Sequence, residues 1–137
     1  MPVRESTARW SGDLKSGSGR MSFGDFSGPF TFASRFETGP GTNPEELIGA
    51  AHAGCFAMAF SNMLAQAGFT PDSVTTTAAV TLDGASGITG IQLNCDAAVP
   101  GIDDDQFQEI AAEAKVGCPV SRALAATPIE LTATLVE

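Results

Sequence analysis

Short segments in which hydrophobic and polar residues alternate occupy the first third of the chain, a pattern typical of half-buried strands. Two of them, Ser6 to Trp10 and Arg20 to Phe23, flank the turn-rich run Ser16 to Gly19. A third, Phe30 to Phe36, alternates phenylalanines with other residues, which places Arg35 on the face opposite the rings. The pattern therefore predicts three antiparallel strands.

The next segment carries the start and stop signals of a long helix. Asn43 suits the N-cap, Pro44 the first helical position and Glu46 the third, where its carboxylate can close a capping box. Gly68 predicts that the helix ends at about Ala67.

The body of this helix is apolar nearly all the way round and must be covered on every side. Burial against a second copy of the chain is the economical solution, because symmetric dimers are the commonest oligomers. The segment is apolar enough to be mistaken for a membrane span, but it contains His52, Asn62 and Gln66 and consists mostly of Ala and Gly. We interpret it as a buried helix of a soluble protein, with no membrane partner.

The second half of the chain predicts a hairpin, a second helix and a last strand. Thr75 to Leu82 and Ile88 to Val99 have the composition of paired strands, and Asp103 to Val116 is amphipathic. Val120 to Ala125 has the length of a short helix, and Pro128 to Val136 alternates as a strand. We expect an α+β fold with two small antiparallel sheets and two main helices, in a single domain over residues 1–137.

Composition limits the partners and the compartment. The formal net charge is −9 and the 7 Lys and Arg are scattered, which argues against nucleic acid as a partner. The first residues lack the apolar core of an export signal, so we expect a cytoplasmic protein whose 3 cysteines are reduced thiols.

The environment of each cysteine decides its chemistry. Taken alone, Cys55 in the long helix is more often a small buried hydrophobe. Cys118 follows a helix-ending Gly and precedes a Pro, where the turning backbone can present a thiol. His52, on the same helical face as Cys55, can lower the pKa of that thiol or join a metal site, although a lone His on an apolar helix is more often a hydrogen-bonded core residue. Cys95 alternates with Leu93 in a strand, which indicates packing.

Two charged residues stand near the start of the long helix without an obvious structural role. Glu46 is explained as a partner in the helix cap, whereas Glu45 is not. Arg35 precedes the loop that leads to this helix, and a guanidinium is a natural partner for a thiolate or an anionic oxygen, or simply for an acid in an ion pair. From the residues alone, the sequence supports only a redox-active thiol.

Several motifs carry a resemblance that extends this hypothesis. They are Thr7 to Gly12 (TARWSG), Ser34 to Glu37 (SRFE), Gly41 to Phe56 (GTNPEELIGAAHAGCF) and Ala114 to Ser121 (AKVGCPVS). In this order they resemble the OsmC/Ohr family of peroxidases over nearly the whole chain, and the OsmC branch more than the Ohr branch. The resemblance implies an OsmC-like fold in which the central helix is buried in an intertwined homodimer.

The resemblance also implies an activity and roles for four residues. Cys55 would be the peroxidatic cysteine that reduces an organic hydroperoxide, and Cys118 the resolving cysteine that forms a disulfide with it. Arg35 would stabilise the thiolate, and Glu45 would orient Arg35. A dithiol, of the lipoyl type in this family, would restore the thiols, and no metal or bound cofactor is needed.

Two other readings belong to different functional classes. A thiol-based redox sensor or binding module would be oxidised without sustained turnover. A structural metal site built from His52, Cys55 and Cys118 lacks a convincing fourth ligand.

Overall fold

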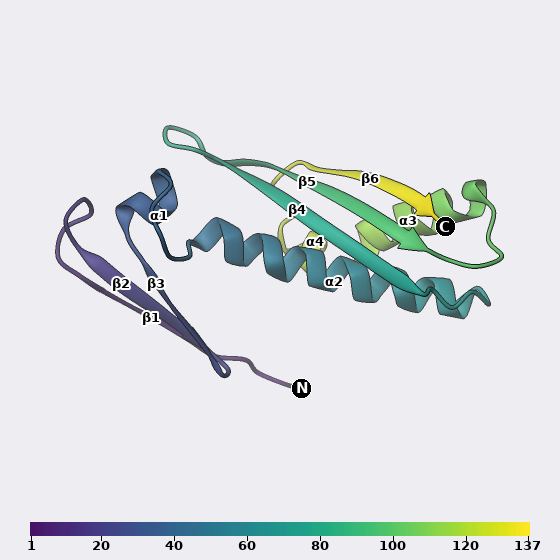
Figure 1. The fold of residues 1–137 in the computed structure, drawn as a ribbon, viewed down its shortest axis with the longest axis horizontal. Helices are drawn as coiled ribbons and strands as arrows, with labels where there is room; N and C mark the ends of the chain where they lie inside the picture. Colours follow the sequence, from purple (N-terminus) through teal and green to yellow (C-terminus); the bar gives the residue numbers. More distant parts are fainter. The chain divides into compact units, whose positions relative to one another are not determined.

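A computed structural model describes all residues, 1–137, and its contacts divide the chain into two compact units, Met1–Leu47 and Ile48–Glu137. The first unit holds a three-stranded sheet, and the second a three-stranded sheet with helices (Figure 1). The α+β class and the two sheets that the sequence predicts are confirmed. The single domain over residues 1–137 stays a prediction.

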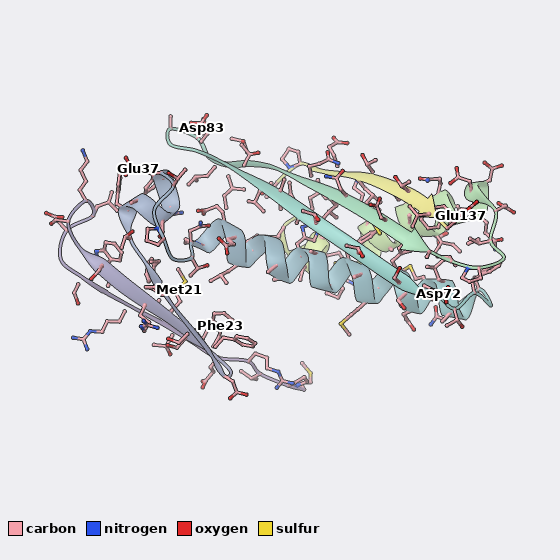
Figure 2. All side chains as sticks on the ribbon, viewed as in Figure 1. Met21, Phe23, Glu37, Asp72, Asp83 and Glu137 are labelled. Carbon is pink, nitrogen blue, oxygen red and sulfur yellow. The ribbon has the colours of Figure 1, made fainter.

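The sheet of the first unit is an antiparallel meander. Strands β1 (Ser6–Ser11), β2 (Ser18–Phe23) and β3 (Phe26–Phe30) pair in the order β1-β2-β3. The labels on β2 in Figure 2, Met21 and Phe23, mark alternate positions of this strand, and both are more covered than Ser22 between them. The strands predicted over Ser6 to Trp10 and Arg20 to Phe23 are confirmed.

The strand predicted over Phe30 to Phe36 is wrong beyond its first residue. β3 ends at Phe30, and Phe32–Phe36 forms a short helix, α1. The side chain of Thr31 accepts a hydrogen bond from the N–H of Ser34, and the Ser34 hydroxyl accepts one from the Thr31 N–H, which closes a capping box. Arg35 therefore projects from a capped helical turn instead of a strand.

The long helix α2 (Pro44–Gln66) begins and ends as the sequence predicts, within one residue. Its start is capped by Asn43, whose Oδ1 accepts a hydrogen bond from the N–H of Glu46 at 2.8 Å. After its last turn, Gly68 adopts a φ of 95°, the left-handed conformation that Gly tolerates best. By length and composition α2 is also apolar enough to cross a membrane, a test that core helices pass too.

The sheet of the second unit is mixed, which corrects the antiparallel prediction. β4 (Ser73–Asp83) and β5 (Gly87–Ala98) form the expected antiparallel hairpin, but β6 (Ile129–Val136) pairs with β5 in parallel. A parallel pair needs a crossover connection. Helices α3 (Asp104–Gly117) and α4 (Pro119–Ala123) provide it. In Figure 2, the label Asp72 marks the residue before β4, and Asp83 is the last residue of this strand.

The core of the second unit lies between its sheet and its helices. The ring centroids of Phe60 on α2 and Phe107 on α3 lie 5.2 Å apart, in an edge-on contact. Gly49 lets α2 approach the sheet, because a Cβ there would lie 3.1 Å from the carbonyl oxygen of Ala78. The predicted apolar stripe of α3 is buried, and the core includes Phe56, Phe60, Leu64, Ile91, Leu93, Cys95, Phe107, Ile110, Ala111, Ala114 and Cys118. This packing fixes α2 against the segment that joins α3 to α4.

Candidate active site

Two free thiols face each other at the junction of three helices. Cys55 lies in the middle of α2, and Cys118 lies between the last residue of α3 and the first of α4. Their Sγ atoms are 2.9 Å apart, with the thiol of Cys118 donating to the sulfur of Cys55. Residues 63 positions apart in the chain are thus placed for direct chemistry between their sulfurs.

Cys118 is held in this position by the ends of two helices. Its N–H donates to the carbonyl oxygen of Ala114 in α3, and Pro119 at the first position of α4 turns the chain away. The side chain is 0% exposed, so the turning backbone does not present the thiol to solvent as its sequence context suggests. Cys55 is the more accessible thiol of the pair.

The two thiols differ in their acidity. Burial raises the pKa of Cys55, and its hydrogen bond with Cys118 raises that pKa further. Burial acts in the same direction on Cys118, but the hydrogen bond with Cys55 and the influence of Ser121 outweigh it and lower the pKa of Cys118. For Cys55, a backbone hydrogen bond from Val120 opposes the increase in pKa, and a nearby positive charge would lower the pKa of such a thiol further.

His52 is a hydrogen-bonded core residue, which is the more frequent situation for a lone His on an apolar helix. It is 0% exposed, and its Nε2 lies 2.7 Å from the Oγ of Ser121 on α4. The Nδ1 atom is buried without a hydrogen-bond partner. Because burial disfavours the imidazolium, the pKa of His52 lies below its usual value of 6.5.

The structure also bears on the metal-site hypothesis and on the third cysteine, Cys95. No group of three or more His, Cys, Asp or Glu side chains is placed to hold a metal ion. Cys95 is 1% exposed in the core, as its alternation with Leu93 indicates, and burial raises the pKa of this thiol. It takes no part in the contact between Cys55 and Cys118.

Arg35 and Glu45 form a bidentate ion pair in the first unit. The Nε and Nη2 atoms of Arg35 donate to Oε1 and Oε2 of Glu45, each at 3.0 Å. The side chain of Glu45 is 9% exposed and that of Arg35 is 36% exposed. The fork fixes the plane of the guanidinium while part of it stays accessible.

An apolar pocket of about 210 Å³ surrounds Arg35. Arg35 is the one charged residue in its wall, and its Cζ lies 5.3 Å from the ring centroid of Phe36. The other lining residues are Trp10, Leu14, Phe30, Thr31, Phe32, Phe36 and Pro44. The pocket suits a hydrophobic group attached to a polar or anionic end.

A second hollow, of about 810 Å³, opens beside Cys55. Its wall is mostly apolar, and Met58 in it is 76% exposed. Val116 at the end of α3 is 72% exposed. The lining residues are Cys55, Met58, Ala59, Asn62, Met63, Gly117 and Pro119.

Comparison with known proteins decides the family. The family model described as OsmC-like protein matches residues 37–133. The chain is 52% identical to "Peroxiredoxin OsmC" of Escherichia coli over 131 residues, 90% of each protein. The chain belongs to the OsmC family.

Other members show how wide the resemblance is. This OsmC-family chain is 36% identical to the organic hydroperoxide resistance protein of Xanthomonas axonopodis pv. citri over 103 residues, 71% of this chain and 68% of that one. Its fold matches an OsmC-like protein from Mycoplasma pneumoniae with a TM-score of 0.77 at 18% identity, covering 99% of both chains. The OhrB protein of Bacillus subtilis matches with a TM-score of 0.67 at 20% identity, over 96% of this chain and 98% of that one.

Sequence reasoning names the cysteines, Arg35 and Glu45 but misses two features of this OsmC-family chain. The first is the aromatic wall around Arg35, because the strand predicted over Phe30 to Phe36 turns the rings away from that residue. The second is Ser121 as the partner of His52. A signal was present, since His52 precedes Cys55 by three residues and Ser121 follows Cys118 by three.

The buried His52 predicts a pH-dependent stability. Its pKa is lower in the folded than in the unfolded protein, so the unfolded protein binds the proton preferentially as the pH falls. The free energy of unfolding should keep its full value above the unfolded pKa of 6.5 and decrease as the pH falls through it. Urea denaturation at pH about 7.5 and about 5.5 measures the change. In His52→Gln the decrease should be smaller, and an equal decrease in both proteins would contradict the assignment.

Proposed function

We propose that this protein is a cysteine-based peroxidase that reduces organic hydroperoxides to alcohols. One observation carries the proposal: the sulfurs of Cys55 and Cys118 face each other at 2.9 Å in a chain of the OsmC family. The names of its relatives, peroxiredoxin and organic hydroperoxide resistance protein, agree with this activity. Oxidation and reduction take place on the sulfurs, so the cycle needs no metal or bound cofactor.

The first step is attack by the Cys55 thiolate on the distal oxygen of the hydroperoxide. An S–O bond forms and the O–O bond breaks, which oxidises the sulfur to a sulfenic acid. The leaving alkoxide takes a proton and departs as the alcohol. Cys55 suits this role because it is the more accessible thiol of the pair and lines the hollow in the second unit.

The second step forms the disulfide. The Cys118 sulfur attacks the sulfur of the sulfenic acid, an S–S bond forms, and the S–O bond breaks. The hydroxide that leaves combines with the proton given up by Cys118 and departs as water. A dithiol then reduces the disulfide by exchange, and the family resemblance favours a lipoyl-type reductant.

Arg35 supplies the cation that ionisation of Cys55 requires. A guanidinium keeps its charge and can donate to both the thiolate and the developing alkoxide. Glu45 orients it through two parallel hydrogen bonds of 3.0 Å. The apolar pocket around Arg35 accommodates the organic part of the substrate, which favours alkyl and aryl hydroperoxides over hydrogen peroxide.

The active form is a soluble cytoplasmic homodimer. In the chain by itself only 28% of the most apolar window of α2 is buried, although the composition of the helix demands cover on every side. Met58 on α2 leaves apolar surface exposed at the Cys55 hollow, and Val116 at the end of α3 is exposed as well. A second copy of the chain supplies the missing cover.

Substitution of the thiols tests the two-step cycle. Cys55→Ser should abolish consumption of cumene hydroperoxide with dihydrolipoamide as reductant, because the attacking sulfur is gone. Cys118→Ser should consume about one equivalent and stop as a sulfenic acid. Cys95→Ala removes the buried third thiol and should keep turnover. Turnover in Cys55→Ser would contradict the roles, and one equivalent followed by silence in the unsubstituted protein would favour a redox sensor.

Replacement of Arg35 tests the source of the positive charge. Arg35→Ala should raise the pKa of Cys55 and slow the first step by about a hundredfold, the usual effect of losing one preorganised donor. Ultraviolet thiolate titration and stopped-flow kinetics in a Cys118→Ser background measure both. Arg20→Ala, which removes an exposed Arg of the same sheet unit, is the matched control. An unchanged titration in Arg35→Ala would remove this residue from the mechanism.

A charge on the exposed face of α2 tests the dimer. Met58→Glu should lower the molar mass measured by light scattering from that of a dimer to that of a 14.0 kDa monomer, because a buried, unpaired carboxylate opposes association. Met58→Leu keeps the face apolar and should remain dimeric. A monomeric unsubstituted protein, or a dimeric Met58→Glu variant, would contradict this interface.

A further inference from the structure

The hydrogen bond between His52 and Ser121 connects the same two segments as the cysteine pair. His52 and Cys55 stand three residues apart on α2, so they share one face of that helix. Cys118 is the N-cap residue of α4, and Ser121 occupies the third position of this helix. The contacts at 2.7 Å and 2.9 Å are therefore two neighbouring connections between α2 and the α3–α4 junction.

All the members of this second connection are buried. His52 is 0% exposed and Ser121 is 5% exposed, so each polar atom there depends on a protein partner. A polar pair in such a place costs desolvation that an apolar pair would avoid. The core around this polar pair is otherwise hydrophobic, so packing alone does not explain why a His and a Ser lie there.

Ser121 also stands one helical turn from the cysteine, at the third position of the helix that Cys118 caps. In the thiol form Cys118 donates to Cys55 and makes no side-chain hydrogen bond to its own helix. Burial raises the pKa of Cys118, but its hydrogen bond with Cys55 and, after that, the N–H and hydroxyl of Ser121 lower that pKa overall. The hydroxyl has one proton, and its direction determines whether the sulfur receives it.

His52 determines that direction when its Nε2 carries the proton. Nε2–H then donates to the Oγ of Ser121, and the hydroxyl proton of Ser121 is left for the sulfur of Cys118. The partnerless Nδ1 is consistent with this tautomer, because a bare acceptor there needs no proton, whereas an imidazolium would bury an N–H with no acceptor. A neutral His52 thus acts through Ser121 on the second cysteine.

We propose that His52 and Ser121 are positioning residues for the disulfide-forming step, in which they hold a hydroxyl proton toward the sulfur of Cys118 as it attacks oxidised Cys55. The inference rests on the cycle proposed above and assigns a separate mechanism to its second step. The S–S bond forms as the S–O bond breaks, and the hydroxide leaves as water with the proton from Cys118. Ser121 keeps its own proton throughout.

Deletion of the hydroxyl tests the inference. In Ser121→Ala the sulfenic acid of Cys55 should form at the unsubstituted rate after one equivalent of cumene hydroperoxide, but its conversion to the disulfide should slow by about tenfold or more, the loss expected for a hydrogen bond to a charged group. Rapid quench with dimedone, followed by mass spectrometry, measures both rates. Ser121→Thr keeps the hydroxyl and should restore the second rate. Equal rates of conversion in folded Ser121→Ala and the unsubstituted protein would overturn the inference.

Replacement of His52 gives a second pair of variants if Ser121→Ala fails to fold. Gln places an amide N–H near the position of Nε2, and Leu places none. His52→Leu should slow disulfide formation and His52→Gln should largely keep it. Equal slowing in both variants, or equal slowing of sulfenic acid formation, would indicate a structural role and overturn the inference.

A titration separates this inference from the peroxidase proposal. In a Cys55→Ser background no peroxide chemistry takes place, yet Ser121→Ala should still raise the pKa of Cys118, measured by thiolate absorbance against the Cys55→Ser/Cys118→Ser double variant. An unchanged pKa contradicts the role of Ser121 whatever the activity. If Ser121→Ala raises the pKa of Cys118 but Cys55 of the unsubstituted protein never forms a sulfenic acid, the result supports the hydrogen bonds and contradicts the proposed cycle.

Discussion

The contact between the sulfurs of Cys55 and Cys118 depends on how α2 packs in the second unit. Phe56 follows Cys55 directly and Phe60 follows it by five residues, and both rings are buried in the core that α3 completes with Phe107. Close packing of this kind leaves little freedom for either helix to slide. The 2.9 Å separation of the sulfurs therefore depends on the whole core. Substitutions that leave a cavity in the core should weaken this contact even when they lie far from the sulfurs.

Burial of the two cysteines in this core also opposes their ionisation. A thiol in an apolar environment resists ionisation, and the two cysteines meet this constraint differently. The hydrogen bond between the two thiols lowers the pKa of Cys118, which Ser121 and the backbone of α4 lower further, whereas the same hydrogen bond raises the pKa of Cys55. In the proposed cycle the first thiolate depends on a guanidinium and the second on a neutral chain of hydrogen bonds. This division gives each step its own chemical control.

Local signals in the sequence predict the helices well. Asn43, Pro44 and Gly68 mark the ends of α2, and the apolar spacing of α3 identifies its buried stripe. The segment Phe30 to Phe36 is mispredicted because residues 32 and 36 satisfy both a strand alternation and a helical spacing of four; the capping box of Thr31 and Ser34 decides for the helix. Strand direction is not encoded in alternation, so the parallel pairing of β6 was also missed.

The site shows the same limit. Motifs identify Cys55, Cys118, Arg35 and Glu45 as candidates, and the structure places them in two pairs, one with facing sulfurs and one with a bidentate ion pair. Partners such as Ser121 emerge only when residues distant in sequence are brought together by packing. The roles of the four candidates in catalysis stay predictions.

Mapping of the oxidised protein tests the central claim most directly. Reduced protein would receive one equivalent of cumene hydroperoxide, remaining thiols would be alkylated, and peptides would be mapped without reductant. The account predicts a linked pair of peptides that contain Cys55 and Cys118, with Cys95 recovered as an alkylated thiol. A protein in which all 3 cysteines remain alkylated, or in which the disulfide includes Cys95, would contradict it.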